Sequence, residues 1–157
     1  MNVKPKLSLV DQTVSINRPI AHVFAFVSNH ENYLQWFPGV VTIVSADQLA
    51  HGTVGKIYRE TLRLPIGRHQ AIDIAVVTSQ PPELFVTEGT FAPLHPRMEI
   101  RLTQTSAQET MLSLRFFSRS QSTIARWLIG IFVKPTFARQ SRRGLHRLKG
   151  ILEAQTP

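Results

Sequence analysis

The feature that most constrains the fold is a long central stretch in which polar and apolar residues alternate, from Val40 to Phe117. A repeat of two residues is typical of β-strands with one buried face. Residues that a central strand cannot accommodate, such as Pro65 and Pro81-Pro82, divide the stretch. Strands are therefore predicted over 40–45, 52–64, 68–79, 84–91, 98–105 and 110–117.

Helical patterns flank this stretch on both sides. Residues 12–16 alternate like one more strand, and two short helices are predicted after them, over 19–28 and 31–37. From Thr123 onward, apolar residues recur at spacings of three and four, with an interruption or kink at Pro135. The short connections between strands favour antiparallel pairing. The predicted fold class is α+β, with a seven-stranded antiparallel sheet and a long C-terminal helix.

The alternation also predicts which side chains face that helix. On the sixth strand Met98 and Ile100 alternate with the charged Glu99 and Arg101, so the apolar pair faces inward. The fifth strand is equally apolar on both faces, and its inner face stays open. The other expected inward residues are Val54, Lys56, Tyr58, Glu60, Leu62, Leu64, Ile72, Ile74, Val76, Leu102, Leu112, Leu114, Phe116 and the helical stripe Ile124, Trp127, Leu128, Ile131 and Phe132.

Length and composition set the class of protein. The chain has 157 residues, 43% of them hydrophobic and 18% charged, which predicts one folded domain over 1–157. It has no cysteine, which excludes disulfides, thiolate metal sites and a cysteine nucleophile. The first twelve residues lack the apolar run of a signal peptide, and no apolar stretch is long enough to span a bilayer. A cytoplasmic protein is therefore expected.

The positive charge is concentrated in the last third of the chain. The formal net charge is +8, and no acidic residue occurs between Glu109 and Glu153. The basic face of the last helix can be simply solvated, or bind an anionic membrane surface, or bind nucleic acid, which we expect least. The segment 124–133 has the amphipathic character of an interfacial segment. The residues that would form an anionic-surface site are Arg139, Arg142, Arg143 and Lys149.

No sequence motif with a known reaction is present. The chain lacks the nucleophile elbow of hydrolases, the phosphate-binding loop, the zinc-protease helix motif and the dinucleotide fingerprint. Its six histidines show no metal-ligand spacing. Neither a metal nor a cofactor is expected.

Several local motifs resemble those of one family. They are the run INRPIAHVFAFVSN at 16–29, Trp36 followed by Pro38-Gly39-Val40, the Pro81-Pro82 turn and the ending RGLHRLK at 143–149. Together with the order of elements, they resemble the helix-grip fold of the START-like, or SRPBCC, superfamily. This superfamily includes polyketide cyclase/dehydrase-like, coenzyme-Q-binding and lipid-transfer proteins. The resemblance implies a curved sheet that grips the last helix around a largely apolar cavity.

The resemblance also implies a ligand and a set of residues around it. The ligand would be a small hydrophobic or amphipathic molecule, such as a lipid, a quinone or a polyketide-like compound. The oligomeric state is left open. The residues expected either to line the cavity or to fill the core are Trp36, Phe37, Tyr58, Leu62, Ile72, Ile74, Met98, Ile100, Leu112, Leu114, Trp127 and Phe132.

Glu60 is the candidate catalytic residue. Strand alternation places it between Tyr58 and Leu62 on the inner face, unless a twist or bulge turns it to solvent. A carboxyl group in the cavity can act as general acid or base in the enolisation or dehydration of a ketone, with Tyr58 as hydrogen-bond donor. Three functions thus remain open: a ligand-binding protein, a cyclase- or dehydratase-type enzyme, and a protein that interacts with a membrane surface through its basic C-terminal helix.

Overall fold

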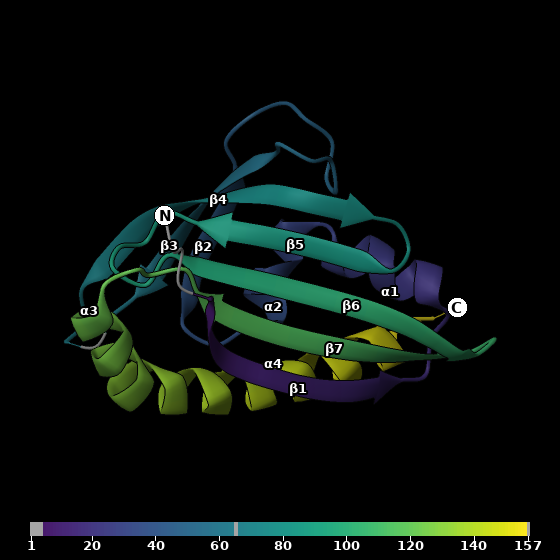
Figure 1. The fold of residues 1–157 in the computed structure, drawn as a ribbon. Helices are drawn as coiled ribbons and strands as arrows, with labels where there is room; N and C mark the ends of the chain where they lie inside the picture. The colour runs from purple at the N-terminus through teal and green to yellow at the C-terminus, as the bar shows by residue number, and fades with distance from the viewer. Residues whose placement is uncertain (1–4, 65, 157) are drawn as a thin grey trace.

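The structure is a computed structural model that describes residues 5–64 and 66–156. Pro65, which divides two of the predicted strands, lies outside the described residues, as do residues 1–4 and 157 of the predicted domain. Seven antiparallel strands form one curved sheet (Figure 1). Their bounds are β1 Leu7–Ile16, β2 Val40–Ser45, β3 Ile57–Arg63, β4 His69–Gln80, β5 Leu84–Gly89, β6 Pro96–Ser106 and β7 Glu109–Ser118.

The strand order in the sheet is β1-β7-β6-β5-β4-β3-β2, so the first two strands lie at opposite edges. The chain crosses between these edges through α1 (Ile20–Val27), the 3-10 helix η1 (His30–Asn32) and α2 (Tyr33–Trp36). The strands from β2 to β7 then follow one another as hairpins. The predicted fold is confirmed: a seven-stranded antiparallel sheet, short helices after the first strand, and a long C-terminal helical segment across the concave face (Figure 1).

The third strand is shorter than predicted. It begins at Ile57 rather than at residue 52, because Gly52 and Gly55 have φ angles of +77° and +93° that are incompatible with a strand. The loop before it is held by Asp47, whose carboxylate accepts a hydrogen bond from the Ile57 N–H at 2.6 Å. Lys56 Nζ donates to the Leu49 carbonyl oxygen at 2.7 Å, so this buried ammonium points into the loop.

The C-terminal segment has three parts. Helix α3 (Thr123–Leu128) continues through a π-helical turn, η2 (Ile129–Val133), into α4 (Lys134–Ala154). The predicted interruption at Pro135 is thus a change of helix type: the proline lies in the first turn of α4, directly after the π-helical turn. The apolar spacing of this part of the sequence predicts a stripe of Ala138, Ser141, Leu145, Leu148 and Leu152; Ala138 is half-buried and the other four are buried.

A glycine lets α4 lie against the short helix α2. A Cβ atom added to Gly144 would lie 3.3 Å from the Trp36 carbonyl oxygen and 3.3 Å from Phe37 Cδ2. Because the two backbones approach so closely, Trp36 is enclosed between the helices and is 1% exposed. The same contact fixes Phe37 at the end of α2, where the open part of the concave face begins.

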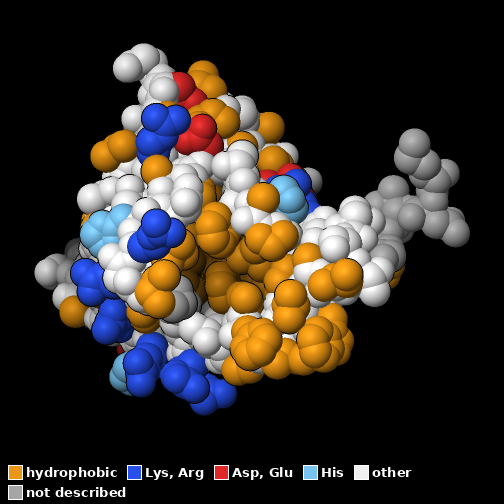
Figure 2. Space-filling model, turned by 90° about the vertical axis from the view of Figure 1, so that its left-hand side faces the viewer, with side chains coloured by type: hydrophobic (Ala, Val, Ile, Leu, Met, Phe, Trp, Pro, Cys, Tyr) orange, Lys and Arg blue, Asp and Glu red, His pale blue; other side chains and the backbone are white. Residues whose placement is uncertain are grey.

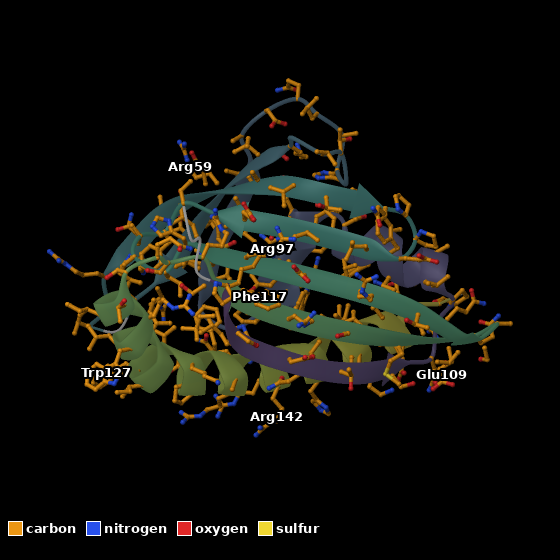
Figure 3. The ribbon with its side chains drawn as sticks, viewed as in Figure 1. Arg59, Arg97, Glu109, Phe117, Trp127 and Arg142 are labelled. Carbon is orange, nitrogen blue, oxygen red and sulfur yellow. The ribbon has the colours of Figure 1, made fainter. Side chains whose placement is uncertain are left out.

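The stripe predicted to face inward on α3 and η2 faces solvent instead, which corrects that prediction. Trp127 and Phe132 are 66% and 68% exposed. The other side of the segment packs on the core, with Ile129 buried and Val133 half-buried. Figures 1 and 3 show the reason: α3 lies beyond the end of the sheet, and Trp127 points away from it.

Candidate functional site: a cavity between the sheet and the C-terminal helices

A cavity of about 370 Å³ lies between the sheet and the C-terminal helices. Its walls come from η1, α2, the strands β2 to β7, η2 and the start of α4, with the loop around Pro93 at one side. Figure 2 shows the opening as a hollow lined by hydrophobic side chains at the α3 end of the molecule. Its volume falls within the range of small-molecule sites, about 300–1,000 Å³.

About half of the residues expected at the ligand site line this cavity. They share an inward position on the open part of the sheet or on the helices that face it. They are Phe37, Leu62, Ile72, Ile74, Met98 and Phe132, and Glu60 lies on the same wall. The inner face of β5, which the sequence left open, is the one that carries Thr87 and Gly89.

The other expected wall residues do not line the cavity. Ile100, Leu112 and Leu114 are buried where α1 packs directly on β6 and β7, so no space remains beside them. Trp36 is enclosed in the contact between α2 and α4, and Trp127 lies on the surface. The wall expected from the sequence is corrected accordingly: α1 covers the part of the sheet where these strand residues lie, and only the other part of the concave face borders the cavity.

A buried polar pair interrupts the apolar wall. Glu60 Oε2 lies 3.2 Å from His30 Nε2, and the two side chains are 5% and 3% exposed. Strand β3 aims the carboxyl group inward, and η1 places the imidazole opposite it. The other ring nitrogen of His30, Nδ1, is buried and has no hydrogen-bond partner among the described residues. The pair can therefore exchange a proton, or hydrogen-bond a polar group, inside an otherwise apolar space.

Sequence reasoning missed His30. It considered histidines only as metal ligands, whereas this one lies three residues before Tyr33 and seven before Phe37, on one helical face. Asn29 starts the turn by accepting a hydrogen bond from the Glu31 N–H at 3.1 Å, and the His30 ring then stacks on Tyr33 with centroids 4.9 Å apart. The spacing of an aromatic face that includes one histidine was the available signal.

Tyr58 faces away from the cavity, which corrects its expected role beside Glu60. Its hydroxyl group hydrogen-bonds His51 Nδ1 at 2.8 Å, and the Lys56 ammonium lies over its ring at 5.0 Å from the centroid. Burial raises the pKa of Tyr58 to about 12, and the negative charges of Glu31 and Asp47 act in the same direction. Tyr58 therefore supports the back of the His30 ring, 5.4 Å away between centroids, rather than the ligand space.

The two tyrosines of the chain give a testable pH dependence. Burial raises the pKa of Tyr33 well above its usual value, and the negative charge of Glu60 raises it further. In an absorbance titration, the folded protein should form no tyrosinate until the pH nears 12, the value to which the Tyr58 pKa is raised. The unfolded chain should ionise both groups near pH 10.

The free energy of unfolding should respond to the same shift. Since both pKa values are raised in the folded state, this contribution is fully present below about pH 10 and is lost as the pH rises toward the folded values. Tyrosinate absorbance at pH 10 from a protein that is still folded, as judged by circular dichroism, would contradict this description of the two rings.

The expected anionic-surface residues lie on the outer side of α4. Arg139, Arg142 and Arg143 are exposed, and Figure 3 shows Arg142 pointing away from the sheet. Lys149 is instead occupied within the molecule, because its Nζ lies 2.6 Å from the Ser15 carbonyl oxygen and 2.7 Å from Glu153 Oε1. Three of the four residues are thus available to an external anion.

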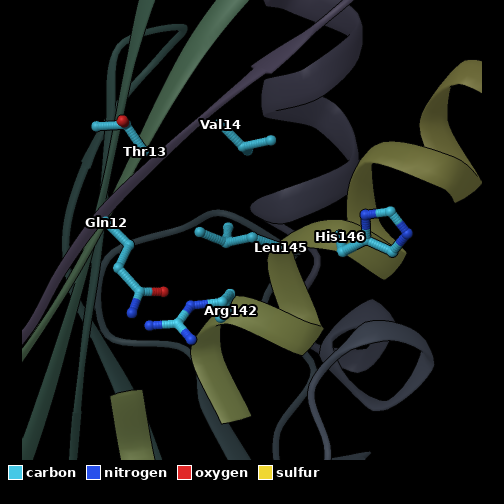
Figure 4. A pocket seen from close by; sticks show the side chains of 6 residues that line it. All are labelled: Gln12, Thr13, Val14, Arg142, Leu145 and His146. Atoms are coloured by element: carbon cyan, nitrogen blue, oxygen red, sulfur yellow. The ribbon is translucent and has the colours of Figure 1, made fainter. Parts of the chain in front are cut away.

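A second hollow, open to solvent, lies between β1 and α4. It is lined by Gln12, Thr13, Val14, Arg142, Leu145 and His146 (Figure 4). The carboxamide of Gln12 is already used, since its Nε2 donates to the Ala138 carbonyl oxygen at 3.0 Å. This hollow offers a ligand far less enclosure than the cavity, and we do not assign it a function.

Residues 5–64 and 66–156 offer neither a metal site nor a membrane-spanning helix. No group of three histidine or acidic side chains within this part of the chain is arranged to hold a metal ion. None of its helices combines the length and the apolar character needed to cross a membrane.

Comparison with known proteins identifies the family. The family model for polyketide cyclase / dehydrase and lipid transport proteins matches residues 9–153. The chain belongs to this family. Among curated proteins, none matches the sequence.

Solved structures show the same fold at low sequence identity. A START superfamily protein from Mycobacterium smegmatis superimposes with a TM-score of 0.72 at 14% identity, covering 95% of this chain and 99% of that one. The Zhui aromatase/cyclase from a Streptomyces species gives 0.70 at 18% identity and 92% coverage of both chains. The di-domain ARO/CYC protein BexL gives 0.70 at 19% identity over 96% of this chain and 51% of its own. These three proteins share the fold with this chain.

Proposed function

We propose that the chain binds one small hydrophobic or amphipathic molecule, of the lipid, quinone or polyketide type, in the cavity between the sheet and the C-terminal helices. The observation that carries the proposal is an enclosed apolar space with one buried polar pair in its wall. Apolar walls bind the body of such a ligand, and a few convergent polar groups fix its orientation.

The polar pair limits the chemistry of the ligand. Glu60 and His30 place a carboxyl group and an imidazole in the cavity wall. A hydroxyl group on the ligand, within reach of Glu60, would donate a hydrogen bond to its carboxylate. Arg63 and Gln140 also contribute to the cavity wall and offer polar contacts there. The ligand is therefore expected to combine an apolar body with at least one oxygen-bearing group.

Filling the cavity tests the proposal. Leu62→Trp should lower the affinity for a neutral hydrophobic fluorophore, N-phenylnaphthylamine, by about tenfold or more, because the indole occupies space beside half-buried Leu62. Val44→Trp adds the same ring on the exposed side of β2, where Val44 is 55% exposed, and should leave the affinity unchanged. Fluorescence titration measures both affinities, and thermal unfolding verifies that both variants are folded.

Equal affinities for the two variants would place the fluorophore elsewhere and contradict the proposal. Native mass spectrometry of the protein purified from its own source then identifies the natural ligand, since a molecule held in an enclosed cavity can survive purification. A co-purified mass should be present in the Val44→Trp protein and absent from the Leu62→Trp protein.

A second function, a cyclase- or dehydratase-type reaction on the same ligand, is favoured by one specific observation. Glu60 and His30 lie 3.2 Å apart in a site shielded from water, which is the geometry of a general acid and base acting together. Among the proteins with the same fold are ones named as aromatase/cyclases. The pair assigned here replaces the expected combination of Glu60 with Tyr58, because the Tyr58 hydroxyl group hydrogen-bonds His51.

A further inference from the structure

The segment formed by α3 and η2 carries an apolar stripe that no described part of the chain covers. Its side chains are between 42% and 74% exposed, although all are large and apolar. Single exposed apolar residues are common on protein surfaces, but a contiguous group usually marks a binding surface. We call this group the apolar stripe; it consists of Ile124, Trp127, Leu128, Ile131 and Phe132.

The stripe is mounted on a fixed support. Ile129 is buried on the opposite side of the segment, and Ser122 caps α3 by accepting a hydrogen bond from the Ala125 N–H at 3.3 Å. Arg126 donates from one guanidinium nitrogen to the carbonyl oxygens of Pro5 at 2.8 Å and Ser120 at 3.3 Å. The fold therefore holds these apolar side chains at the surface, and their exposure does not result from fraying of a helix end.

All charged residues near the apolar stripe in the sequence are positive. No acidic residue occurs between Glu109 and Glu153. Lys134 directly follows η2 and Arg139 lies further along α4, and neither forms an ion pair with any described residue. Figure 2 shows hydrophobic side chains beside the hollow and Lys and Arg side chains along its flank. An apolar surface flanked by cations matches an apolar layer with anionic groups at its edge.

The stripe is also continuous with the cavity. Phe132 belongs to the stripe and lines the cavity, and Ile129 and Val133 line it from the same turn. A molecule leaving the cavity past Phe132 would therefore meet the partner of the stripe before it met bulk water.

We propose that α3 and η2 dock on an anionic lipid bilayer, with the apolar stripe in the interfacial layer and Lys134 and Arg139 at the headgroups. A bilayer suits this surface better than a protein partner does. Apart from the Trp127 indole, the stripe has no hydrogen-bonding side chain, and an indole is well placed at a membrane interface. The docking proposal does not depend on the ligand proposed above. Docking would also let that ligand pass between the cavity and the membrane, and this consequence rests on the proposed function.

The tryptophans provide a direct measurement. Trp36 is 1% exposed and Trp127 is 66% exposed, so only Trp127 can change its surroundings on docking. Vesicles of phosphatidylcholine and phosphatidylglycerol in equal parts should shift the tryptophan emission to shorter wavelength. Lipids brominated near the headgroup should quench it. The Trp127→Phe protein should still co-sediment with these vesicles, yet lose both the shift and the quenching.

Matched substitutions separate the apolar and the charged contributions. Trp127→Ser should weaken binding to the anionic vesicles by about tenfold or more, whereas Val54→Ser, at another exposed apolar position, should not. Lys134→Glu should weaken it by about tenfold and make it less sensitive to salt. Arg101→Glu, which reverses an exposed cation on the outer face of β6, should change it little.

Three outcomes would overturn the proposal: no binding of the wild-type protein to the anionic vesicles, equal binding by Trp127→Ser and Val54→Ser, or Trp127-dependent dimers in sedimentation that compete with vesicle binding. The last outcome would assign the stripe to a second copy of the chain. The Leu62→Trp protein keeps the failures distinct. If the cavity binds no ligand but both this variant and the wild type bind vesicles, the proposed function fails and the docking surface stands.

Discussion

A chain that ends at Ser120 is expected not to fold. The deletion removes four buried apolar side chains, Ile129, Leu145, Leu148 and Leu152. At about 1.5–3 kcal/mol for each buried side chain, their loss removes about 6–12 kcal/mol of stabilisation. That is comparable with the whole free energy of unfolding of a typical domain, about 5–15 kcal/mol. The concave face of the sheet would be uncovered as well.

The measurement is the cooperativity of thermal unfolding, together with the solubility of the shortened chain. We expect aggregation or a state without a cooperative transition. A chain that ends at Gln155 is the control, since it keeps α4 and the Gln155 carboxamide that hydrogen-bonds His22 at 2.7 Å. A soluble chain ending at Ser120 with an unchanged melting transition would mean that the helices do not stabilise the sheet.

The sequence predicted the fold because its periods are long and consistent. Seven stretches of period two and a final stretch of helical period specify one sheet and one covering helix. Strand ends were less accurate. The loop before Ile57 was included in the third strand because Val54 and Lys56 continue the alternation, and the positive φ angles of Gly52 and Gly55 end it. Alternation alone does not carry that information.

The cavity was predictable only in part. Strand alternation tells which side chains face inward, but not whether a helix or an empty space lies opposite them. Ile72 and Ile100 are equivalent by sequence, yet Ile72 lines the cavity and Ile100 lies in the part of the sheet on which α1 packs. For the same reason the stripe that includes Trp127 was expected inside. Its exposure depends on where the sheet ends, which is a property of the assembled fold.

The alternation of residues along β3 cannot predict the partner of Glu60, for a different reason. His30 is thirty positions away along the chain and meets Glu60 only because the chain crosses from one edge of the sheet to the other through η1. Alternation gave Tyr58 as the neighbour, since the two share a face of β3. The structure divides that face: the Glu60 side points into the cavity and the Tyr58 hydroxyl group points to His51.

Glu60→Gln is expected to separate binding from catalysis with the largest functional effect. Glutamine keeps the shape of the side chain and can still hydrogen-bond His30, but it cannot take up or release a proton at this position. If the chain transforms its ligand, turnover should fall by about 10²–10⁴-fold, with affinity largely kept. If it only binds the ligand, affinity for the neutral fluorophore should change little, and no conversion should be seen in either protein.

The substrate for this measurement is the co-purified molecule or its precursor, followed by mass spectrometry for loss of water or a change of ring number. Glu83→Gln, at an exposed position in the turn before β5, is the matched control and should behave like the wild type. His30→Gln gives a second reading, because it removes the imidazole and leaves Glu60 in place. An enzyme that uses the pair should lose turnover in both variants. Full turnover in Glu60→Gln, with conversion in the wild type, would remove Glu60 from the reaction and leave the cavity as a binding site whose chemistry lies elsewhere.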